Sequence, residues 1–281
     1  MKVNAIDIKQ SVLETLRLKK YAGVRADDYV IPSNYIEAKN QFWRDWQSLE
    51  PDHYLKGNSS FRYRRFCYFY YHPEDDELAA FANTPYYQPA ELNSYVGGIF
   101  RHFSPMQRQT LDNRFLHDLI RVMFKQFPLT SEMRSHPWKL DVHQVRIVGS
   151  AKEKGEPTPE GIHHDENDFV SMHLVNRQNA IGGISGVYNT DKQPIDSITL
   201  TEPMDSLLVW DQHVMHAVSP IHPLNPDAEA IRDVLIIGYS HEPLLQHPSE
   251  VTSDDLIQSL KEQYQHEKQE QDETALLKEE E

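Results

Sequence analysis

Short apolar segments follow one another from Leu140 to Ser240, and this pattern is the strongest constraint on how the chain folds. Turn-forming residues such as Gly149, Gly182 and Pro203 separate them. The segments are LDVHQVRIVG, DFVSMHLV, GGISGVYN, SITLTEP, DSLLVWD, HAVSPI and DVLIIGYS. Many short strands with regular punctuation are typical of an all-β barrel or jelly roll. The long helical connections that a doubly wound parallel sheet requires are missing between them. The pattern therefore predicts a mainly β fold.

Helices are expected to flank this β-rich half. The spacing of apolar residues predicts one helix near 8–18. Asn34 and Glu37 form a capping-box-like pair, which predicts the start of a second helix. Apolar residues that fall on one side predict a third helix near 106–127, and Pro128 ends it.

The chain divides into three predicted parts around one aromatic strand. The run from 61 to 71, FRYRRFCYFYY, alternates aromatic residues with Arg and suits a strand with one buried face. We expect an N-terminal helical segment over 1–60 that packs on the core. The core domain is expected over 61–248, with the helix near 106–127 inserted in it. An acidic C-terminal helix and tail is expected over 249–281.

The charge balance argues against two classes of partner. Lys and Arg number 28 and Asp and Glu number 43, so the formal charge is −15. Phosphate backbones and anionic lipid surfaces repel such a chain, so we expect a small-molecule substrate and neither a nucleic acid nor a membrane. No apolar run is long enough to cross a membrane, and MKVNAIDIKQ lacks the apolar stretch of a signal peptide. A cytoplasmic location is the resulting expectation.

Histidine is the notable ligand-forming residue in the composition. Cys67 is the single cysteine, whereas there are 15 histidines. One cysteine excludes a disulfide framework, a cysteine-rich zinc site and an iron–sulfur cluster. Any bound metal must therefore have nitrogen and oxygen ligands.

The densest group of such ligands is the segment PEGIHHDENDF. His163 and Asp165 are two positions apart, so on an extended backbone both side chains point to one face. His216 offers a third ligand, and enough chain separates it from Asp165 for several strands to return to the site. Two histidines and one carboxylate on one face form the facial triad of non-haem Fe(II) enzymes.

Other histidines compete for these positions. His164 would replace His163, but adjacent residues on a strand point in opposite directions. His213 is an alternative to His216, because both lie in the run DQHVMH. His173, within VSMHLV, is expected to be a strand residue rather than a ligand.

Arg232 begins the strongly apolar segment RDVLIIGY. A guanidinium at the end of a buried strand is costly unless an anion meets it. Its planar fork suits a carboxylate, as in a 2-oxo diacid. The alternative is an ordinary ion pair with Asp233.

Several motifs carry a family resemblance. They are HQVRI at 143–147, PxPEGIHxD at 157–165, VNRQN at 175–179, GG at 182–183, VMHxVxPI at 214–221 and RDVL at 232–235, with weaker likeness over 61–71 and in GGxxR at 97–101. The segment from about 138 to 243 thereby resembles the catalytic core of the Fe(II)/2-oxoglutarate-dependent dioxygenases. More narrowly, it resembles the bacterial free-amino-acid hydroxylases of the L-isoleucine 4-hydroxylase type.

The resemblance implies a double-stranded β-helix core (jelly roll, cupin-like) with helices outside. It implies that His163, Asp165 and His216 hold Fe(II). It further implies that Arg232 holds the distal carboxylate of 2-oxoglutarate. In this family 2-oxoglutarate and O₂ are converted to succinate and CO₂ while an unactivated C–H of the substrate is hydroxylated.

The substrate implied is a free L-amino acid, hydroxylated on its aliphatic side chain. Its carboxylate needs a cation, for which Arg146 and Arg101 are candidates. Its ammonium needs an acceptor, for which Glu166 and Asp168 are candidates. Glu166 stands where the family usually has Gly, and the run WDQH at 210–213 also departs from the family pattern. Both departures bear on the choice of substrate.

Two rival functions use the same core. A peptide-bound residue or another small metabolite is the first alternative substrate, and an open, groove-like pocket would favour it. The second rival is a non-catalytic jelly-roll protein that uses its metal for structure or sensing.

Overall fold

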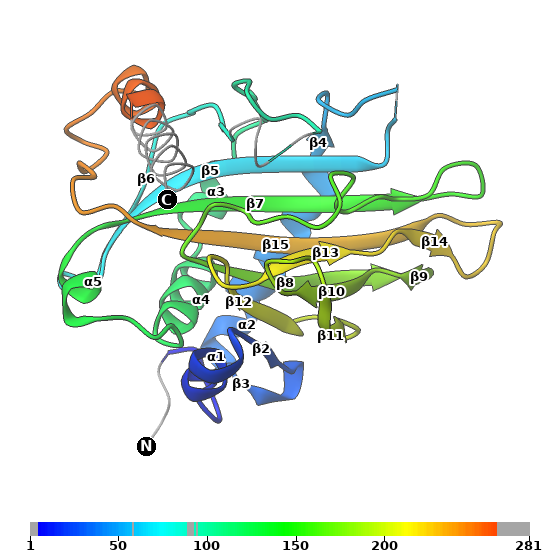
Figure 1. The fold of residues 1–281 in the computed structure, drawn as a ribbon, viewed down its shortest axis with the longest axis horizontal. Coiled ribbons are helices and arrows are strands. Elements are labelled where there is room, and N and C mark those ends of the chain that lie inside the picture. Colours follow the sequence, from blue (N-terminus) through cyan, green and yellow to red (C-terminus); the bar gives the residue numbers. More distant parts are fainter. Residues whose placement is uncertain (1–4, 58, 89–92, 94, 263–281) are drawn as a thin grey trace, which may run out of the picture.

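An eight-stranded antiparallel sheet is the main scaffold of the molecule (Figure 1). The computed structural model describes residues 5–57, 59–88, 93 and 95–262. In spatial order the strands are β2 (Tyr21–Val24), β12 (Ser206–Trp210), β8 (Phe169–Gln178), β15 (Ala230–His241), β7 (Trp138–Gly149), β5 (Arg62–His72) and β4 (Glu50–Pro51), with β6 (Glu77–Ala80) paired to β5. The prediction of a mainly β fold is confirmed.

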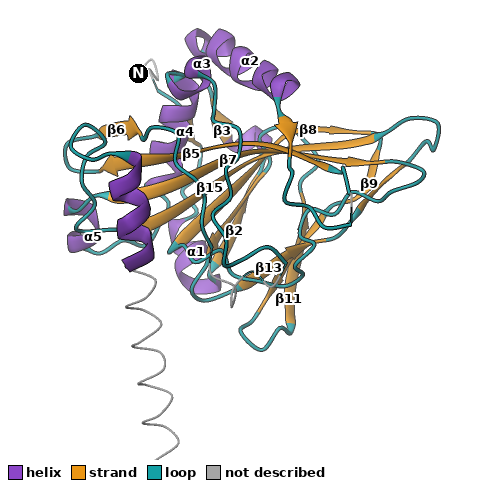
Figure 2. Cartoon of the chain, turned by 90° about the horizontal axis from the view of Figure 1, so that it is seen from above, coloured by secondary structure: helices purple, strands orange, loops and turns teal. Residues whose placement is uncertain are grey.

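A smaller sheet lies against this large one, and Figure 2 shows β13 and β11 set apart from β5 and β7. Its strands are β11 (Pro194–Thr199), β10 (Ile184–Tyr188) and β13 (Met215–Val218). Two separate pairs of short strands are β9 (Ala180–Gly182) with β14 (Ile221–Pro223), and β1 (Asp7–Ile8) with β3 (Tyr29–Val30). One buried cluster joins Val187 of β10 to Val145 of β7 and Leu174 of β8. The two sheets thus share a core, as expected of a double-stranded β-helix.

Helices cover the other face of the large sheet. The helices on this face are α1 (Leu13–Lys19), α2 (Ile36–Arg44), α3 (Arg108–Leu111), α4 (Arg114–Phe124) and α5 (Ser131–Ser135). A further helix over 253–262 packs on the opposite face of β5. Leu16 of α1, Phe42 of α2 and Leu119 of α4 are fully buried. They belong to one cluster with Leu140 and Ile237 of the large sheet. Burial of these apolar faces holds the helices on the sheet.

The expected helix near 106–127 is divided into α3 and α4. The side chain of Asn113 accepts a hydrogen bond of 2.8 Å from the backbone N–H of Phe115, so it caps the start of α4. The capping pair expected at Asn34 and Glu37 is not formed. Asn34 lies in a 3-10 turn, and α2 begins at Ile36 without a side-chain cap.

The N-terminal segment also departs from its expected helical character. Within the helix expected near 8–18, only residues from Leu13 onward are helical. Residues 1–60 also supply β2 and β4, which pair with β12 and β5 of the large sheet. Strands as short as β2 and β4 have too few residues to show a hydrophobic period, so their pairing with distant strands cannot be predicted from the local sequence.

The aromatic strand β5 is buried on two faces, not one. Cys67, Phe69 and Tyr71 pack with the helices. Phe66 and Tyr68 pack in a third cluster that includes Leu256 of the helix over 253–262. Residues 263–281 of the acidic tail expected over 249–281 lie outside the described residues.

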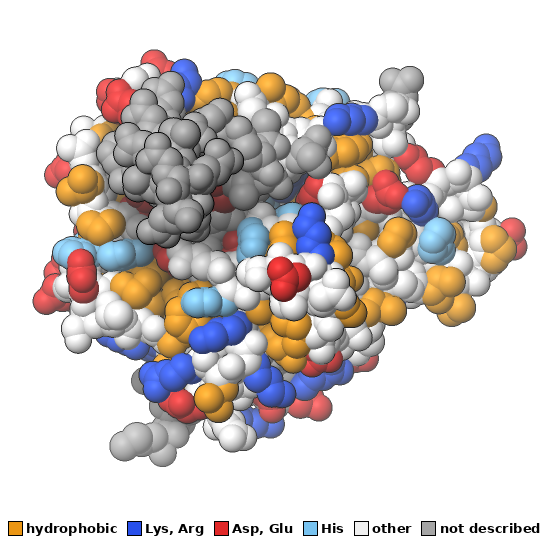
Figure 3. Space-filling view, viewed as in Figure 1, with side chains coloured by type: hydrophobic (Ala, Val, Ile, Leu, Met, Phe, Trp, Pro, Cys, Tyr) orange, Lys and Arg blue, Asp and Glu red, His pale blue; other side chains and the backbone are white. Residues whose placement is uncertain are grey.

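The surface carries mixed charge, and on the face in Figure 3 the Lys and Arg side chains are dispersed among acidic and neutral ones. None of the helices in the described part of the chain is both long and apolar enough to cross a membrane.

Three neighbouring strands of the large sheet present alternate residues to the small sheet. Arg232 of β15 is paired with Ile147 of β7, which is paired in turn with Arg62 of β5. The same alternation continues through Val234, Val145 and Arg64, and then through Ile236, His143 and Phe66. Residues two apart on a strand share a face, so these rows form one wall of the site described below.

Candidate metal and cosubstrate site

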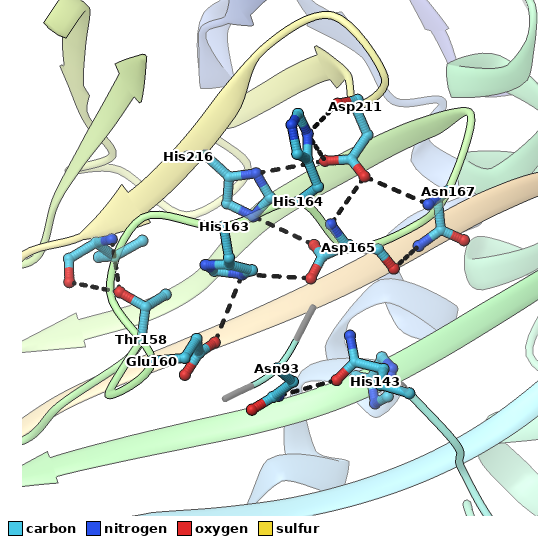
Figure 4. Close-up of polar contacts among 12 residues, drawn as sticks. Asn93, His143, Thr158, Glu160, His163, His164, Asp165, Asn167, Asp211 and His216 are labelled. Atoms are coloured by element: carbon cyan, nitrogen blue, oxygen red, sulfur yellow. Dashed lines mark hydrogen bonds and ion pairs between the residues drawn. The ribbon is translucent and has the colours of Figure 1, made fainter. Parts of the chain in front are cut away.

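Three side chains from two distant segments meet at one point (Figure 4). His163 and Asp165 lie in the loop before β8, and His216 lies on β13. Their candidate ligand atoms all lie within 4.8 Å of one another. Nε2 of His163 is 3.4 Å from Asp165 Oδ1, and Nε2 of His216 is 3.2 Å from Asp165 Oδ2. The structure thus brings together the three residues that the sequence predicts as metal ligands.

A backbone bridge joins the two segments that carry these residues. The N–H of His163 donates to the carbonyl of His216 at 3.1 Å, and the N–H of His216 donates to the carbonyl of His163 at 3.0 Å. The bridge extends the small sheet by one pair. It places the two imidazoles side by side, with ring centroids 4.5 Å apart.

Neighbouring acceptors orient both imidazoles. Nδ1 of His163 donates to the carbonyl of Gly161 at 2.9 Å. Nδ1 of His216 faces Oδ1 of Asp211 at 3.6 Å, and Oδ2 of Asp211 accepts from the backbone N–H of Asp165 at 2.8 Å. A proton on each Nδ1 leaves the lone pair of Nε2 free, which is how partners of this kind prepare a histidine for a metal.

The charged groups of this cluster shift one another's pKa. Burial lowers the pKa of His163, but its hydrogen bond to Asp165 and the charge of that carboxylate outweigh burial, and the pKa is raised to about 9. Burial raises the pKa of Asp165, but the charge of His216 and the hydrogen bond from His163 outweigh it, so the pKa is well below its usual range. The carboxylate is therefore ionised at neutral pH, as a metal ligand must be.

The competing histidines occupy other positions. Nδ1 of His164 hydrogen-bonds to the carbonyl of Asp211, and His213 is exposed in a turn against Trp210. His173 is buried in the core, where its two ring nitrogens contact hydroxyl groups of serine residues. None of these three belongs to the group of converging ligand atoms found among the described residues.

Arg232 is a buried guanidinium without a full set of partners. It is 2% exposed, and its Nε and Nη2 have no hydrogen-bond partner among the described residues. Burial, and then the charge of Arg177, lowers its pKa to about 10, so it remains a cation at neutral pH. Unpaired buried charge of this kind is costly, and a carboxylate with two acceptor oxygens relieves the cost. The ligand triad and this residue together fit Fe(II) and a bound diacid.

A pair of glycines makes room beside Arg232. Gly182 and Gly183 both have positive φ angles, of 80° and 64°. A Cβ on Gly182 would lie 2.0 Å from the carbonyl oxygen of Pro220, and one on Gly183 would lie 3.1 Å from Cδ of Arg232. Only glycine combines this backbone conformation with this close approach.

The triad and Arg232 line one cavity of about 100 Å³, which we call the inner cavity. Its walls come from both sheets, from the loop before β8 and from the segment between β6 and α3. Apolar residues on its walls include Val145, Ile147, Val218, Val234 and Ile236, and its charged residues include Arg62, Arg64, Arg101, Asp141 and Glu160. A larger opening of about 280 Å³, the outer cleft, is lined by residues that include Glu166, Asp168 and Gln212. Tyr86, Asp141 and Asp165 line both spaces, so the outer cleft adjoins the inner cavity.

The four residues predicted to bind substrate fall in different places. Arg101 lines the inner cavity and is 2% exposed. Arg146 does not reach it, because its neighbours Val145 and Ile147 face the cavity and Arg146 therefore points to the other face of β7. There it forms a two-pronged ion pair with Asp233, at 2.7 and 2.8 Å.

The two predicted acceptors lie in the outer cleft. Asp168 accepts hydrogen bonds from Gln212 and from the backbone N–H of His241, at 2.8 and 2.7 Å. Glu166 is exposed and has a φ of 66°. That conformation favours glycine and gives a physical reason for the Gly usual at this position in the family.

The sequence reasoning missed five charged residues around the site. Arg62, Arg64, Asp141 and Glu160 line the inner cavity, and Asp211 contacts His216. The alternation of Arg in β5 was a usable signal for the first two, because it places them on one face. Glu160 lies three residues before His163 in the same motif.

The match to a family model agrees with this geometry. The model for "2OG-Fe dioxygenase" matches residues 44–238. The chain therefore belongs to the 2-oxoglutarate- and iron-dependent dioxygenases. It is an enzyme that uses Fe(II), 2-oxoglutarate and O₂.

The chain is also similar to two named enzymes and to solved structures. It is 26% identical over 247 residues to an L-isoleucine-4-hydroxylase of Bacillus thuringiensis, covering 86% of this chain and 99% of that protein. It is 24% identical over 227 residues to a 3(1)-hydroxy-L-isoleucine 4-dioxygenase of Pantoea ananatis, covering 78% and 87%. A crystal structure of a bsmA homolog from Methylobium petroleophilum is similar, with a TM-score of 0.70, 28% identity and coverage of 84% and 94%. The crystal structure of IDO from B. thuringiensis shares the fold, with a TM-score of 0.69, 21% identity and coverage of 82% and 97%.

Proposed function

We propose that this dioxygenase hydroxylates an unactivated C–H in the aliphatic side chain of a free L-amino acid. In this proposal His163, Asp165 and His216 hold Fe(II), and Arg232 binds the distal carboxylate of 2-oxoglutarate. The single observation that carries these roles is the inner cavity. It joins three converging ligands to a buried guanidinium for which the described part of the chain offers no anionic partner.

The size and lining of the inner cavity support a small substrate. A cavity of about 100 Å³ has no room for a folded polypeptide segment. Its apolar wall, with Val145, Ile147 and Val234, suits an aliphatic chain. The names of the B. thuringiensis and P. ananatis relatives support a free amino acid.

The chain's own residues position the reactants. Bound Fe(II), with 2-oxoglutarate and O₂, supplies the oxidising power that breaks an unactivated C–H bond. Arg232 would hold the diacid, because its planar fork suits a two-pronged contact with a carboxylate, and such a contact would orient the diacid toward the triad. The apolar wall excludes water and holds the aliphatic carbon close to the metal position, and such fixed placement lowers the barrier of the reaction.

Turnover with a defined pool of substrates tests the proposal. The protein is incubated with Fe(II), ascorbate, 2-oxoglutarate and free aliphatic L-amino acids, and succinate and a product one oxygen atom heavier are measured. Succinate that forms only when an amino acid is present supports the proposal. Succinate that forms with an N-blocked peptide and not with free amino acids would overturn it.

A matched pair of variants tests the metal ligands. His216→Ala should abolish turnover and Fe(II) binding, because it removes one of three ligands. His213→Ala should leave both unchanged, since His213 is an exposed residue outside the group of ligand atoms. The reverse outcome would show that His213 is the ligand.

A further inference from the structure

A cluster of arginines lines the inner cavity away from Arg232. Arg62, Arg64 and Arg101 are 7%, 9% and 2% exposed. Among the described residues, the carboxylate of Asp52 contacts this cluster directly, at 2.7 Å from Nε of Arg62 and 3.7 Å from Nη1 of Arg64. Within this described part of the chain, three buried cations with one contacting carboxylate leave positive charge uncompensated.

Two of these guanidiniums have N–H groups without an acceptor. Nε of Arg64 and Nε of Arg101 are buried and have no hydrogen-bond partner in the described structure. Both residues line the inner cavity. A buried donor without an acceptor costs roughly 1–3 kcal/mol, and more when it is charged. These two groups therefore favour an anion in the cavity.

The other partners of these arginines are neutral. Nη2 of Arg101 donates to Oε1 of Gln88 at 2.6 Å. Nη2 of Arg64 lies 3.0 Å from Nδ1 of His143. Burial, and then the charge of Arg64, lowers the pKa of His143 to about 4, so this ring is an uncharged acceptor at neutral pH. Neither contact neutralises a guanidinium.

An acidic side chain faces the same cavity from the metal side. Glu160 lines the inner cavity, and its Oε1 lies 3.5 Å from Nε2 of His163 (Figure 4). Its side chain is 12% exposed. Arg101 lines the same cavity, where burial lowers its pKa and the negative charge of Glu160 is among the charges that oppose this lowering. A ligand that carries a carboxylate and an ammonium on one carbon complements them both.

We propose that Arg64 and Arg101 bind the carboxylate of the substrate and that Glu160 binds its α-ammonium. The site then selects an α-amino acid with both groups free. It rejects esters, amides and N-acyl derivatives, which leave buried charges unpaired. The inference rests on the proposed function and assigns to Glu160 the role first considered for Glu166 and Asp168.

The substrate side of this contact is tested on the unmodified enzyme. L-Leucine, L-isoleucine, L-valine and L-methionine are first screened, and the best substrate is compared with its methyl ester and with its des-amino acid. Each change should lower kcat/KM roughly tenfold or more, because a charge-assisted hydrogen bond is lost. Equal turnover of the acid and the ester would overturn the role of the arginines.

Variants then connect each group of the substrate to its partner. Glu160→Gln should raise KM for the amino acid roughly tenfold or more and should remove the penalty for deleting the ammonium, since the two changes delete one contact. Arg101→Gln should likewise raise KM for the amino acid, and it should remove the penalty for replacing the carboxylate by the methyl ester. Glu156→Gln is the control, because Glu156 forms a surface ion pair with Lys154 at 2.6 Å. If Glu166→Gln, and not Glu160→Gln, weakens binding, the acceptor is Glu166 and the proposal is wrong.

Binding measurements separate the remaining outcomes. Iron content and the visible absorption of the Fe(II)–2-oxoglutarate complex should be unchanged in Glu160→Gln, whereas calorimetry should show weaker amino-acid binding. Loss of iron would place Glu160 in the metal site and overturn the proposal. If no free amino acid is turned over but another compound is, the proposed function fails. If amino acids are turned over and Glu160→Gln shows no coupling to the ammonium, this inference alone fails.

Discussion

The substitution Gly238→Ala tests whether close packing behind Asp165 maintains the metal site. A Cβ at this position would lie 2.3 Å from both Nδ2 of Asn167 and Oδ1 of Asp141. Favourable contacts between non-bonded heavy atoms need about 3.5 Å, so in Gly238→Ala these side chains must retreat by about 1 Å. Nδ2 of Asn167 lies 3.5 Å from the carbonyl oxygen of Asp165. The retreat should therefore displace a proposed metal ligand.

The expected cost follows from overpacking. Forcing an extra carbon into a packed site costs about 1–3 kcal/mol, and for a chain of this size each kcal/mol lowers Tm by roughly 2–4 °C. Thermal unfolding, measured with and without Fe(II) and 2-oxoglutarate, should show a lower Tm and a smaller stabilisation by the metal. Gly23→Ala is the matched control, since Gly23 is also in the large sheet and its Cβ would meet Ile198 at 3.6 Å, an ordinary contact. A wild-type Tm and wild-type metal affinity in Gly238→Ala would refute the reasoning.

Three further outcomes concern the groups around the metal. Asp211→Asn should weaken Fe(II) binding about 10–100-fold, because the carboxylate that faces His216 Nδ1 is lost; an unchanged titration of the metal-free protein contradicts this. Arg232→Lys keeps the charge but loses the planar fork, so KM for 2-oxoglutarate should rise at least roughly tenfold, and an unchanged KM would place the diacid elsewhere. The pKa of His163 is about 9 in the folded, metal-free protein and about 6.5 in the unfolded chain. Charged His163 therefore stabilises the metal-free fold fully below a pH of about 6.5, and this stabilisation is lost as the pH rises through about 9. Metal competes with that proton, so metal affinity should rise across the same window, whereas a pH-independent affinity would exclude His163 as a ligand.

The candidate metal ligands could be recognised from the sequence because their spacing is local. His163 and Asp165 are two positions apart, and that spacing carries over directly to one face of an extended segment. His216 required only the assumption that a β-rich chain returns to the same place. A candidate metal site can therefore be predicted from a local cluster of ligand-forming residues before the pairing of the strands is known.

The charged walls of the inner cavity were harder to predict because they depend on pairing between distant strands. Arg146 was a candidate for the substrate carboxylate, but it points away from the cavity, whereas Arg64 lines it. The side chains on one strand alternate between faces, and only the register of β5 against β7 shows which set faces the small sheet. The same applies to β2, which has no recognisable period of its own and joins the large sheet through β12.

The alternation of residues along β15 limits how the sequence of this enzyme can change in evolution. Arg232, Val234, Ile236 and Gly238 all line the inner cavity, and the intervening residues belong to the opposite face. Deleting a single residue between Arg232 and Gly238 would turn part of this strand inside out, exchanging cavity residues for residues that pack elsewhere. Length variation among descendants of this gene should therefore accumulate in the connecting loops, while β15 changes by substitution alone.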